Sequence, residues 1–232
     1  MTSTPRRRLA VFDCDGTLVD SQHAIHAAAS AAFARENLDP PSKAELIRVV
    51  GLPLAECIAR LAPDASADRQ TRLVEGYKSA FFELRQRPDH HEPLYPGVLE
   101  ALAATEEAGF LLGIATGKAR RGLMAVLERH DLQHRFVTLQ TGDQGHGKPH
   151  PDMLLRAMAE TGAAPADTVM IGDTSFDMMM ATNAGVDAIG VTWGYHPAAE
   201  LTTAGARLLI AAFSELPAAL SRPEIRGRPS CA

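Results

Sequence analysis

The stretch LAVFDCDGTL, residues 9–18, decides the fold class of this 232-residue chain. Its first four residues form a short apolar run that ends at acidic and glycine residues, which is typical of a buried parallel strand stopping at a functional loop. Similar apolar runs, most of them separated by helical patterns, follow at 110–115, 137–140, 168–171 and 188–192. Strands that alternate with helices predict an α/β fold built on a parallel sheet.

The chain between residue 20 and about residue 93 lacks such runs and shows helical patterns instead, at 24–36, 42–50, 54–61 and 66–87. Ser42 and Glu45 have the spacing of a capping box, and Gly51-Leu52-Pro53 predicts a turn. We therefore expect residues 20–93 to form an all-α insertion, and residues 1–19 with 94–232 to form the α/β core. The proline- and arginine-rich tail after Leu220 is expected to be frayed.

Composition excludes several classes of protein. With 46% hydrophobic and 22% charged residues, the chain is typical of a folded globule. A net charge of −5 and only short arginine clusters argue against a nucleic-acid partner. Three cysteines without a CxxC pair suit a reducing compartment. The N-terminal apolar run is too short for a signal peptide and no stretch could cross a membrane, so we expect a cytoplasmic protein without a membrane partner.

Asp13 and Asp15 follow the first predicted strand, at the sheet edge where parallel α/β folds bind ligands. Two carboxylates about 4 Å apart repel by about 4 kcal/mol at an effective dielectric of about 20, which favours a bound cation such as Mg²⁺. Gly16 permits close approach of an anion, and Thr17 offers a hydroxyl donor. A plain turn would explain the same residues.

Two further segments offer groups that suit a phosphate. Thr116 and Gly117 end the second core strand, where hydroxyl and backbone donors could reach phosphate oxygens, although a helix-capping threonine is an alternative. Lys148 is flanked by Pro149 after a glycine-rich stretch, so its cation is held on a rigid turn. A solvated surface lysine is the alternative.

Asp173 and Asp177 come directly after the apolar run at 168–171 and add two more carboxylates. Helix capping would also explain them. Four separate segments at predicted strand ends nevertheless supply the acids, the hydroxyl and the lysine that metal-assisted phosphoryl transfer requires.

These four segments, in this order, closely resemble the motifs of the haloacid dehalogenase superfamily of phosphatases, over residues 9–194. The resemblance implies a Rossmann-like core with the helical insertion as a small cap, as in the phosphoglycolate-phosphatase-like subgroup. It also implies a phosphotransferase and not a dehalogenase, because the dehalogenases lack the acid at the position of Asp15.

The resemblance further implies a role for each residue in a phosphoric monoester hydrolase. Asp13 would be the nucleophile and form a phosphoaspartate, while Asp15 would act as general acid and then general base. Mg²⁺ would be bound by Asp13, the backbone carbonyl of Asp15 and Asp173. Asp177 would contact these ligands without binding the metal itself. Thr116 and Lys148 would have both catalytic and phosphate-binding roles, and Gly16, Thr17 and Gly117 would also bind the phosphate.

Selectivity among small-molecule phosphate monoesters is expected to come from the cap. The break at Gly51 and Leu52 resembles the specificity loop of the subgroup. Arg48 could pair with a carboxylate such as that of phosphoglycolate, or be an exposed helix cation. Lys118, beside Gly117, is a comparable candidate.

Three other functions remain open. A sugar phosphomutase would use the same Asp13 and Asp15, and an inorganic pyrophosphatase could carry the same cap. A non-catalytic phosphate-binding protein is disfavoured, because neither the predicted acid nor the lysine is missing. The sequence predicts no oligomeric state.

Overall fold

The structure, a computed structural model, describes residues 7–225 and is built on one six-stranded parallel sheet. The strand order is β3-β2-β1-β4-β5-β6, which confirms the predicted α/β class. The first five strands overlap the predicted apolar runs, whereas β6 was not predicted. The strands are β1 (Arg8–Phe12), β2 (Phe110–Thr116), β3 (Phe136–Thr141), β4 (Thr168–Gly172), β5 (Asp187–Val191) and β6 (Leu208–Ile210).

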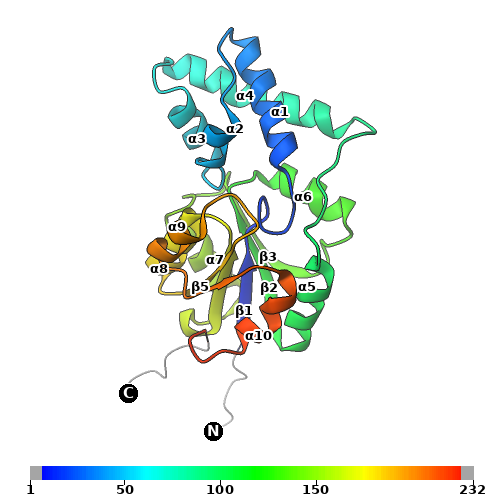
Figure 1. The fold of residues 1–232 in the computed structure, drawn as a ribbon, viewed down its shortest axis with the longest axis vertical. Coiled ribbons are helices and arrows are strands. Elements are labelled where there is room, and N and C mark those ends of the chain that lie inside the picture. Colours follow the sequence, from blue (N-terminus) through cyan, green and yellow to red (C-terminus); the bar gives the residue numbers. More distant parts are fainter. Residues whose placement is uncertain (1–6, 226–232) are drawn as a thin grey trace.

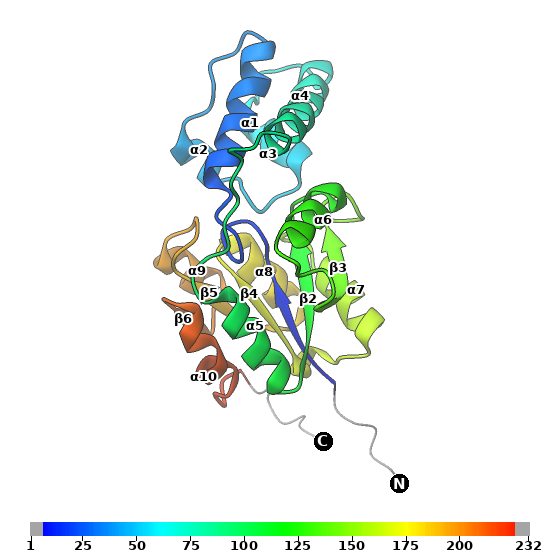
Figure 2. The same cartoon turned by 90° about the vertical axis from the view of Figure 1, so that its right-hand side faces the viewer.

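Helices cover both faces of this sheet (Figures 1 and 2). One face carries α5 (Val98–Glu107), α6 (Arg120–Arg129) and α10 (Leu216–Leu220). The other carries α7 (Asp152–Thr161), α8 (Ser175–Ala184) and α9 (Ala198–Ala204). Two short 3-10 helices complete the core, η1 (Pro165–Asp167) and η2 (Phe213–Glu215).

The two-sided burial explains why the strands are apolar throughout. In β1, Ala10 and Phe12 pack into the cluster on one face, and Leu9 and Val11 pack into the cluster on the other. Successive strand residues point to opposite faces, so a strand covered on both sides needs apolar residues at every position. The last residue of β1, Phe12, pairs with Ile114 and Ile171, which aligns the ends of three strands at one edge.

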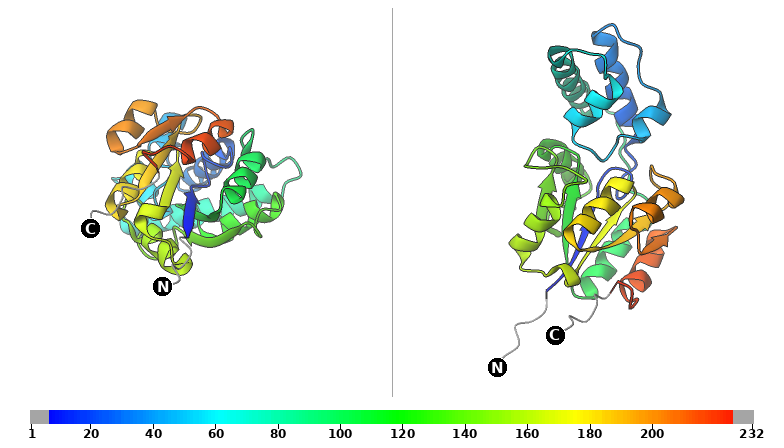
Figure 3. Two further views of the ribbon diagram at one scale, coloured as in Figure 1. Left: turned by 90° about the horizontal axis from the view of Figure 1, so that it is seen from below. Right: turned by 90° about the vertical axis from the view of Figure 1, so that its left-hand side faces the viewer.

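Four helices stand apart from the sheet, beyond its carboxyl edge (Figure 1 and the right-hand view of Figure 3). They are α1 (Gln22–Arg35), α2 (Lys43–Ile47), α3 (Leu54–Leu61) and α4 (Ala67–Arg85). Helices α1 and α4 pack closely, and a Cβ added at Gly76 would lie 3.5 Å from the Cα of Ala32. The capping box of Ser42 and Glu45 is confirmed, although α2 is shorter than predicted.

The chain passes between these helices and the core twice, and the two passages are hydrogen-bonded to each other. Val19 and Leu94 form an isolated antiparallel bridge, the Asp20 N–H donates to the Pro93 carbonyl at 2.9 Å, and the Tyr95 N–H donates to the Leu18 carbonyl at 3.0 Å. We propose that residues 20–93 form a cap domain, which we call the cap below.

The predicted frayed tail is described only in part. Ile225 is buried in the core cluster beside α10, so the tail packs on the core at least as far as this residue. Residues 226–232 lie outside the described residues.

Candidate active site

Four chain segments meet at the carboxyl edge of the sheet. Asp13 follows β1, Thr116 ends β2, Lys148 lies in the loop after β3, and Asp173 follows β4. All four side chains are buried. Parallel neighbouring strands bring their carboxyl ends together, and the structure does so with the residues that the sequence singled out.

Lys148 forms a buried ion pair with two carboxylates. Its Nζ lies 2.9 Å from Oδ1 of Asp13 and 2.6 Å from Oδ1 of Asp177, and all three side chains are almost completely inaccessible. Lys148 is therefore not a surface lysine. Charge-assisted contacts of this length hold both Asp13 and Lys148 in fixed positions.

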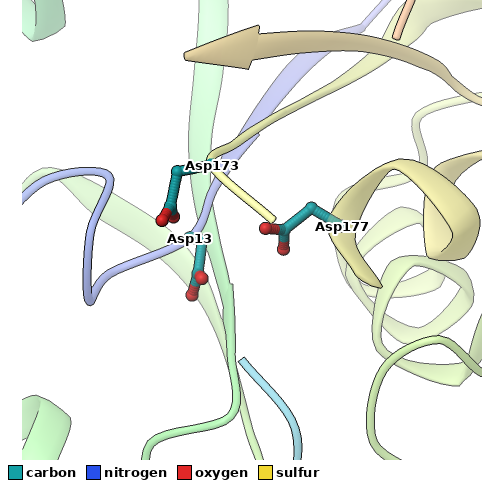
Figure 4. Close-up of side chains that lie close together, drawn as sticks. All are labelled: Asp13, Asp173 and Asp177. Atoms are coloured by element: carbon teal, nitrogen blue, oxygen red, sulfur yellow. The ribbon is translucent and has the colours of Figure 1, made fainter. Parts of the chain in front are cut away.

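The carboxylates of Asp13, Asp173 and Asp177 form a buried acidic cluster, with ligand oxygens within 4.8 Å of one another (Figure 4). Burial raises the pKa of Asp13 to about 7, an effect that Lys148 opposes and Asp177 reinforces. Burial, with the neighbouring carboxylates, also raises the pKa of Asp173 well above its usual range. If all three carboxylates were ionised, the single ammonium of Lys148 would leave two negative charges, and the raised pKa values show that the cluster resists this state unless a further cation is bound. These oxygen donors therefore fit a divalent cation such as Mg²⁺.

Asp173 is oriented by donors from two other loops. The Thr17 hydroxyl donates to its Oδ1 at 2.8 Å, and the Tyr195 N–H donates to its Oδ2 at 2.9 Å. A Cβ added at Gly16 or Gly194 would lie within 2.3 Å of Asp173 atoms, so glycine is required on both sides. The sequence analysis did not predict Gly194 and Tyr195 as site residues. Their position shortly after a predicted strand could have indicated them, because the other site residues also follow strand ends.

The predicted phosphate donors of the first loop are already engaged. The single proton of the Thr17 hydroxyl is directed at Asp173, and the Gly16 N–H donates to the Val19 carbonyl at 2.9 Å. The structure thus places both residues beside the acidic cluster, but the Thr17 hydroxyl orients Asp173 and the Gly16 N–H orders its own loop.

Asp177 acts both as a helix cap and as a partner of Lys148. Thr174 is the N-cap of α8, and its hydroxyl and N–H donate to Oδ2 of Asp177 at 2.7 and 3.0 Å. The other oxygen of Asp177 pairs with Lys148. With both oxygens engaged, Asp177 is suited to positioning the lysine.

Asp15 lies at the junction of the core and the cap. Its Oδ1 accepts from the Ser21 hydroxyl at 2.5 Å and from Nζ of Lys118 at 2.7 Å. Lys118 also contacts Oε1 of Glu92 at 3.3 Å. Ser21 and Glu92 were missed by sequence reasoning, but both stand next to the predicted domain boundaries, where polar residues can act on a site between two domains.

Glu92 provides a pH-dependent contribution to stability. Burial alone would raise its pKa, but Lys118, His90 and Arg85 lower it to about 2. A carboxyl with a depressed pKa stabilises the fold above its unfolded value of 4.5 and loses that contribution as pH falls toward 2. We expect Glu92→Gln to remove up to about 3 kcal/mol of the pH dependence of unfolding between pH 5 and 2.

Denaturant unfolding across that pH range would measure this effect. Glu100→Gln, an exposed position on α5, is the matched control and should follow the parent protein. The same loss of stability on acidification in Glu92→Gln and in the parent would contradict the assignment.

A cavity of about 350 Å³ lies above Asp13 and Asp15, between the core and the cap. Gly51, Leu52, Thr116, Gly117 and Lys118 all line it. A Cβ on Gly117 would lie 2.6 Å from the carbonyl oxygens of Gly51 and Leu52, so the predicted specificity loop rests directly on the end of β2. Arg48, by contrast, is exposed at the end of α2 and is not part of the cavity wall.

Comparison with known proteins identifies the family. Residues 10–191 match the family described as haloacid dehalogenase-like hydrolase. The chain belongs to the haloacid dehalogenase-like hydrolases. Within this hydrolase family, it is 37% identical over 210 residues to "Probable phosphatase IndB" of Dickeya dadantii, covering 90% of this chain and 91% of the relative. It is 33% identical over 202 residues to "Phosphoglycolate phosphatase" of Agrobacterium fabrum, covering 84% of each.

A haloacid dehalogenase-like fold is also found among solved structures. A haloacid dehalogenase-like hydrolase from Bacteroides fragilis superimposes with a TM-score of 0.82 at 26% identity, covering 91% of this chain and all of that one. Among residues 7–225, no helix of this hydrolase combines the length and apolar character needed to span a membrane.

Proposed function

We propose that this hydrolase is a Mg²⁺-dependent cytoplasmic phosphatase that cleaves small-molecule phosphate monoesters through an aspartyl-phosphate on Asp13. The proposal rests chiefly on one observation: Asp13 is held by Lys148 beside Asp173, at the cavity between the core and the cap. The printed names of the two relatives, a probable phosphatase and a phosphoglycolate phosphatase, support the same class of reaction.

Asp13 is the nucleophile in this scheme. One of its oxygens forms a bond to phosphorus as the bond from phosphorus to the leaving alcohol breaks. Oδ1 accepts from the Cys14 N–H at 2.6 Å and forms an ion pair with Nζ of Lys148 at 2.9 Å, and both contacts fix the carboxylate for attack. The Thr116 hydroxyl at the cavity and Lys148, which is buried behind Asp13, stabilise the negative charge of the phosphoryl oxygens.

Asp15 moves the protons. It protonates the leaving oxygen in the first step and removes a proton from the attacking water in the second, which releases phosphate and restores Asp13. The contacts from Ser21 and Lys118 hold Asp15 at the cavity, on the side of the cap linkers.

The metal would be held by Asp13, Asp173 and the backbone carbonyl of Asp15. When bound, Mg²⁺ supplies positive charge that offsets both the acidic cluster and the phosphate oxygens. We expect chelation to abolish phosphate release and to lower the melting temperature, because a metal that binds only the folded protein stabilises it and that contribution is lost when the metal is removed. Adding Mg²⁺ back should restore both, and phosphate release that survives exhaustive chelation would contradict the proposed metal dependence.

A phosphate-release screen separates this proposal from its rivals. The purified protein would be given phosphate monoesters, pyrophosphate, sugar phosphates and nucleotides in the presence of Mg²⁺. Release from monoesters supports the phosphatase. Preferential release from pyrophosphate would indicate a pyrophosphatase. Isomerisation of a sugar phosphate without phosphate release would indicate a mutase. Binding without turnover would indicate a non-catalytic phosphate-binding protein.

A further inference from the structure

The cavity above Asp13 and Asp15 has an apolar wall. Each of the four cap helices contributes apolar side chains to it, represented by Ile25, Leu46, Ile58 and Phe81. A volume of about 350 Å³ lies in the range of small-molecule pockets, about 300–1,000 Å³. This wall is far larger and less polar than the two-carbon acid of phosphoglycolate requires.

The cavity is not a gap left by an undocked cap. Val49 and Leu52 of the cap form one buried cluster with Phe176 of the core. Pro53 covers Gly147, where an added Cβ would lie 2.1 Å from the proline ring. The cap is therefore already in contact with the core, and the cavity persists above the reacting groups.

The cations of the cavity wall are engaged with protein groups. Lys118 pairs with Asp15 and Glu92, and Lys78 pairs with Glu75. Arg85 also pairs with Glu92, at 3.6 Å, and its guanidinium stacks on Phe81. The guanidinium of Arg121 lies over the ring of Phe82, 4.3 Å from its centroid. Each of these wall cations thus already contacts a carboxylate or an aromatic ring, so a substrate carboxylate would have to compete with these partners, although the buried Nε of Arg85 has no hydrogen-bond partner.

We propose that the cap selects phosphate monoesters of apolar alcohols, such as unbranched alkyl groups of about four to six carbons, over carboxylate-bearing esters such as phosphoglycolate. The inference rests on the proposed phosphatase function. The phosphate binds at Asp13 and Lys148, and the apolar part of the alcohol extends into the wall. Each buried methylene contributes about 0.8 kcal/mol, which is about a fourfold gain in binding.

A homologous series of substrates tests the proposal. Ethyl, butyl and hexyl phosphate have leaving alcohols of similar acidity, so differences in their turnover reflect contacts with the chain. We expect kcat/KM to rise at least tenfold from ethyl to hexyl phosphate, and hexyl phosphate to exceed phosphoglycolate. A flat series, or a preference for phosphoglycolate, would overturn the proposed substrate class while leaving the phosphatase intact.

Binding of ethyl- and hexylphosphonate, measured by calorimetry with Mg²⁺, provides a readout that needs no turnover. Tighter binding of hexylphosphonate by at least tenfold is expected. If no ester is hydrolysed, the proposed function fails, and the phosphonates still decide whether the wall binds alkyl chains. Equal affinities for the two phosphonates would refute the apolar site.

A substitution in the wall tests where the selectivity resides. Leu54 of α3 lines the cavity and is half-buried, so Leu54→Asn introduces polarity at nearly constant size. The ratio of kcat/KM for hexyl over ethyl phosphate should fall about fivefold. Leu155→Asn, at an exposed leucine of α7, is the matched control and should keep the parent ratio. Circular dichroism would verify folding, and an unchanged ratio in a folded Leu54→Asn would contradict the proposal.

Discussion

Replacing Asp13 with asparagine is expected to reduce phosphate release by on the order of 10⁴-fold or more, since an amide oxygen cannot replace the attacking carboxylate. The fold should survive. Asparagine has nearly the same shape as aspartate, and the exchange removes one negative charge from a cluster in which burial and Asp177 already raise the pKa of Asp13 to about 7. Steady-state phosphate release and thermal unfolding would measure the two effects.

Asp39→Asn is the matched control for this experiment, because Asp39 is exposed on the cap. It should retain full turnover and the parent melting temperature. Turnover near the parent level in Asp13→Asn would remove Asp13 as the nucleophile. A large fall in its melting temperature would instead show that the carboxylate is chiefly structural.

Replacing Lys148 with methionine is expected to damage both stability and turnover. The lysine is the ion-pair partner of Asp13 and Asp177, and removing one member of a buried ion pair costs about 3–5 kcal/mol. Turnover should fall by at least about 10³-fold, because a positive charge facing the phosphoryl group is lost together with the orientation of Asp13.

The stability of Lys148→Met should depend on Mg²⁺ more steeply than that of the parent, since the variant must balance the same carboxylates without an ammonium. Thermal unfolding at a series of Mg²⁺ concentrations would show this. Lys43→Met, at an exposed lysine of the cap, is the matched control and should match the parent. Parent-like melting of Lys148→Met would contradict the structural role given to this ion pair.

The parts of the fold that were predictable from the sequence are those set by local pattern. Strands covered on both faces are apolar at every position, so β1 to β5 are visible as short apolar runs. The edge strand Leu208–Ile210 is only three residues long and was missed for that reason. Helix α2 ends at Ile47, earlier than predicted, because the chain then turns and Val50 forms a local bridge with Leu52. The helical pattern of residues 42–50 does not reveal this bridge.

The residues of the candidate site likewise fall into those that local sequence pattern predicts and those that it does not. Asp13, Lys148 and Asp173 could be predicted because each follows a recognisable strand, and parallel strands bring their ends together. Ser21 and Glu92 could not, because their proximity to Asp15 depends on how the linkers fold back on each other. The sequence also suggested Arg48 for substrate recognition, while the three-dimensional arrangement keeps it outside the cavity.

The paired linkers have a mechanical consequence. Because the chain segments at Val19 and Leu94 are paired, the two connections between the core and the four helices form one narrow link, which we call the hinge. Ser21 and Glu92 sit on that hinge and reach Asp15 directly and through Lys118. Any movement of the four helices relative to the core would therefore disturb the contacts that hold the Asp15 side chain, so that access to the cavity and the position of this carboxylate are coupled.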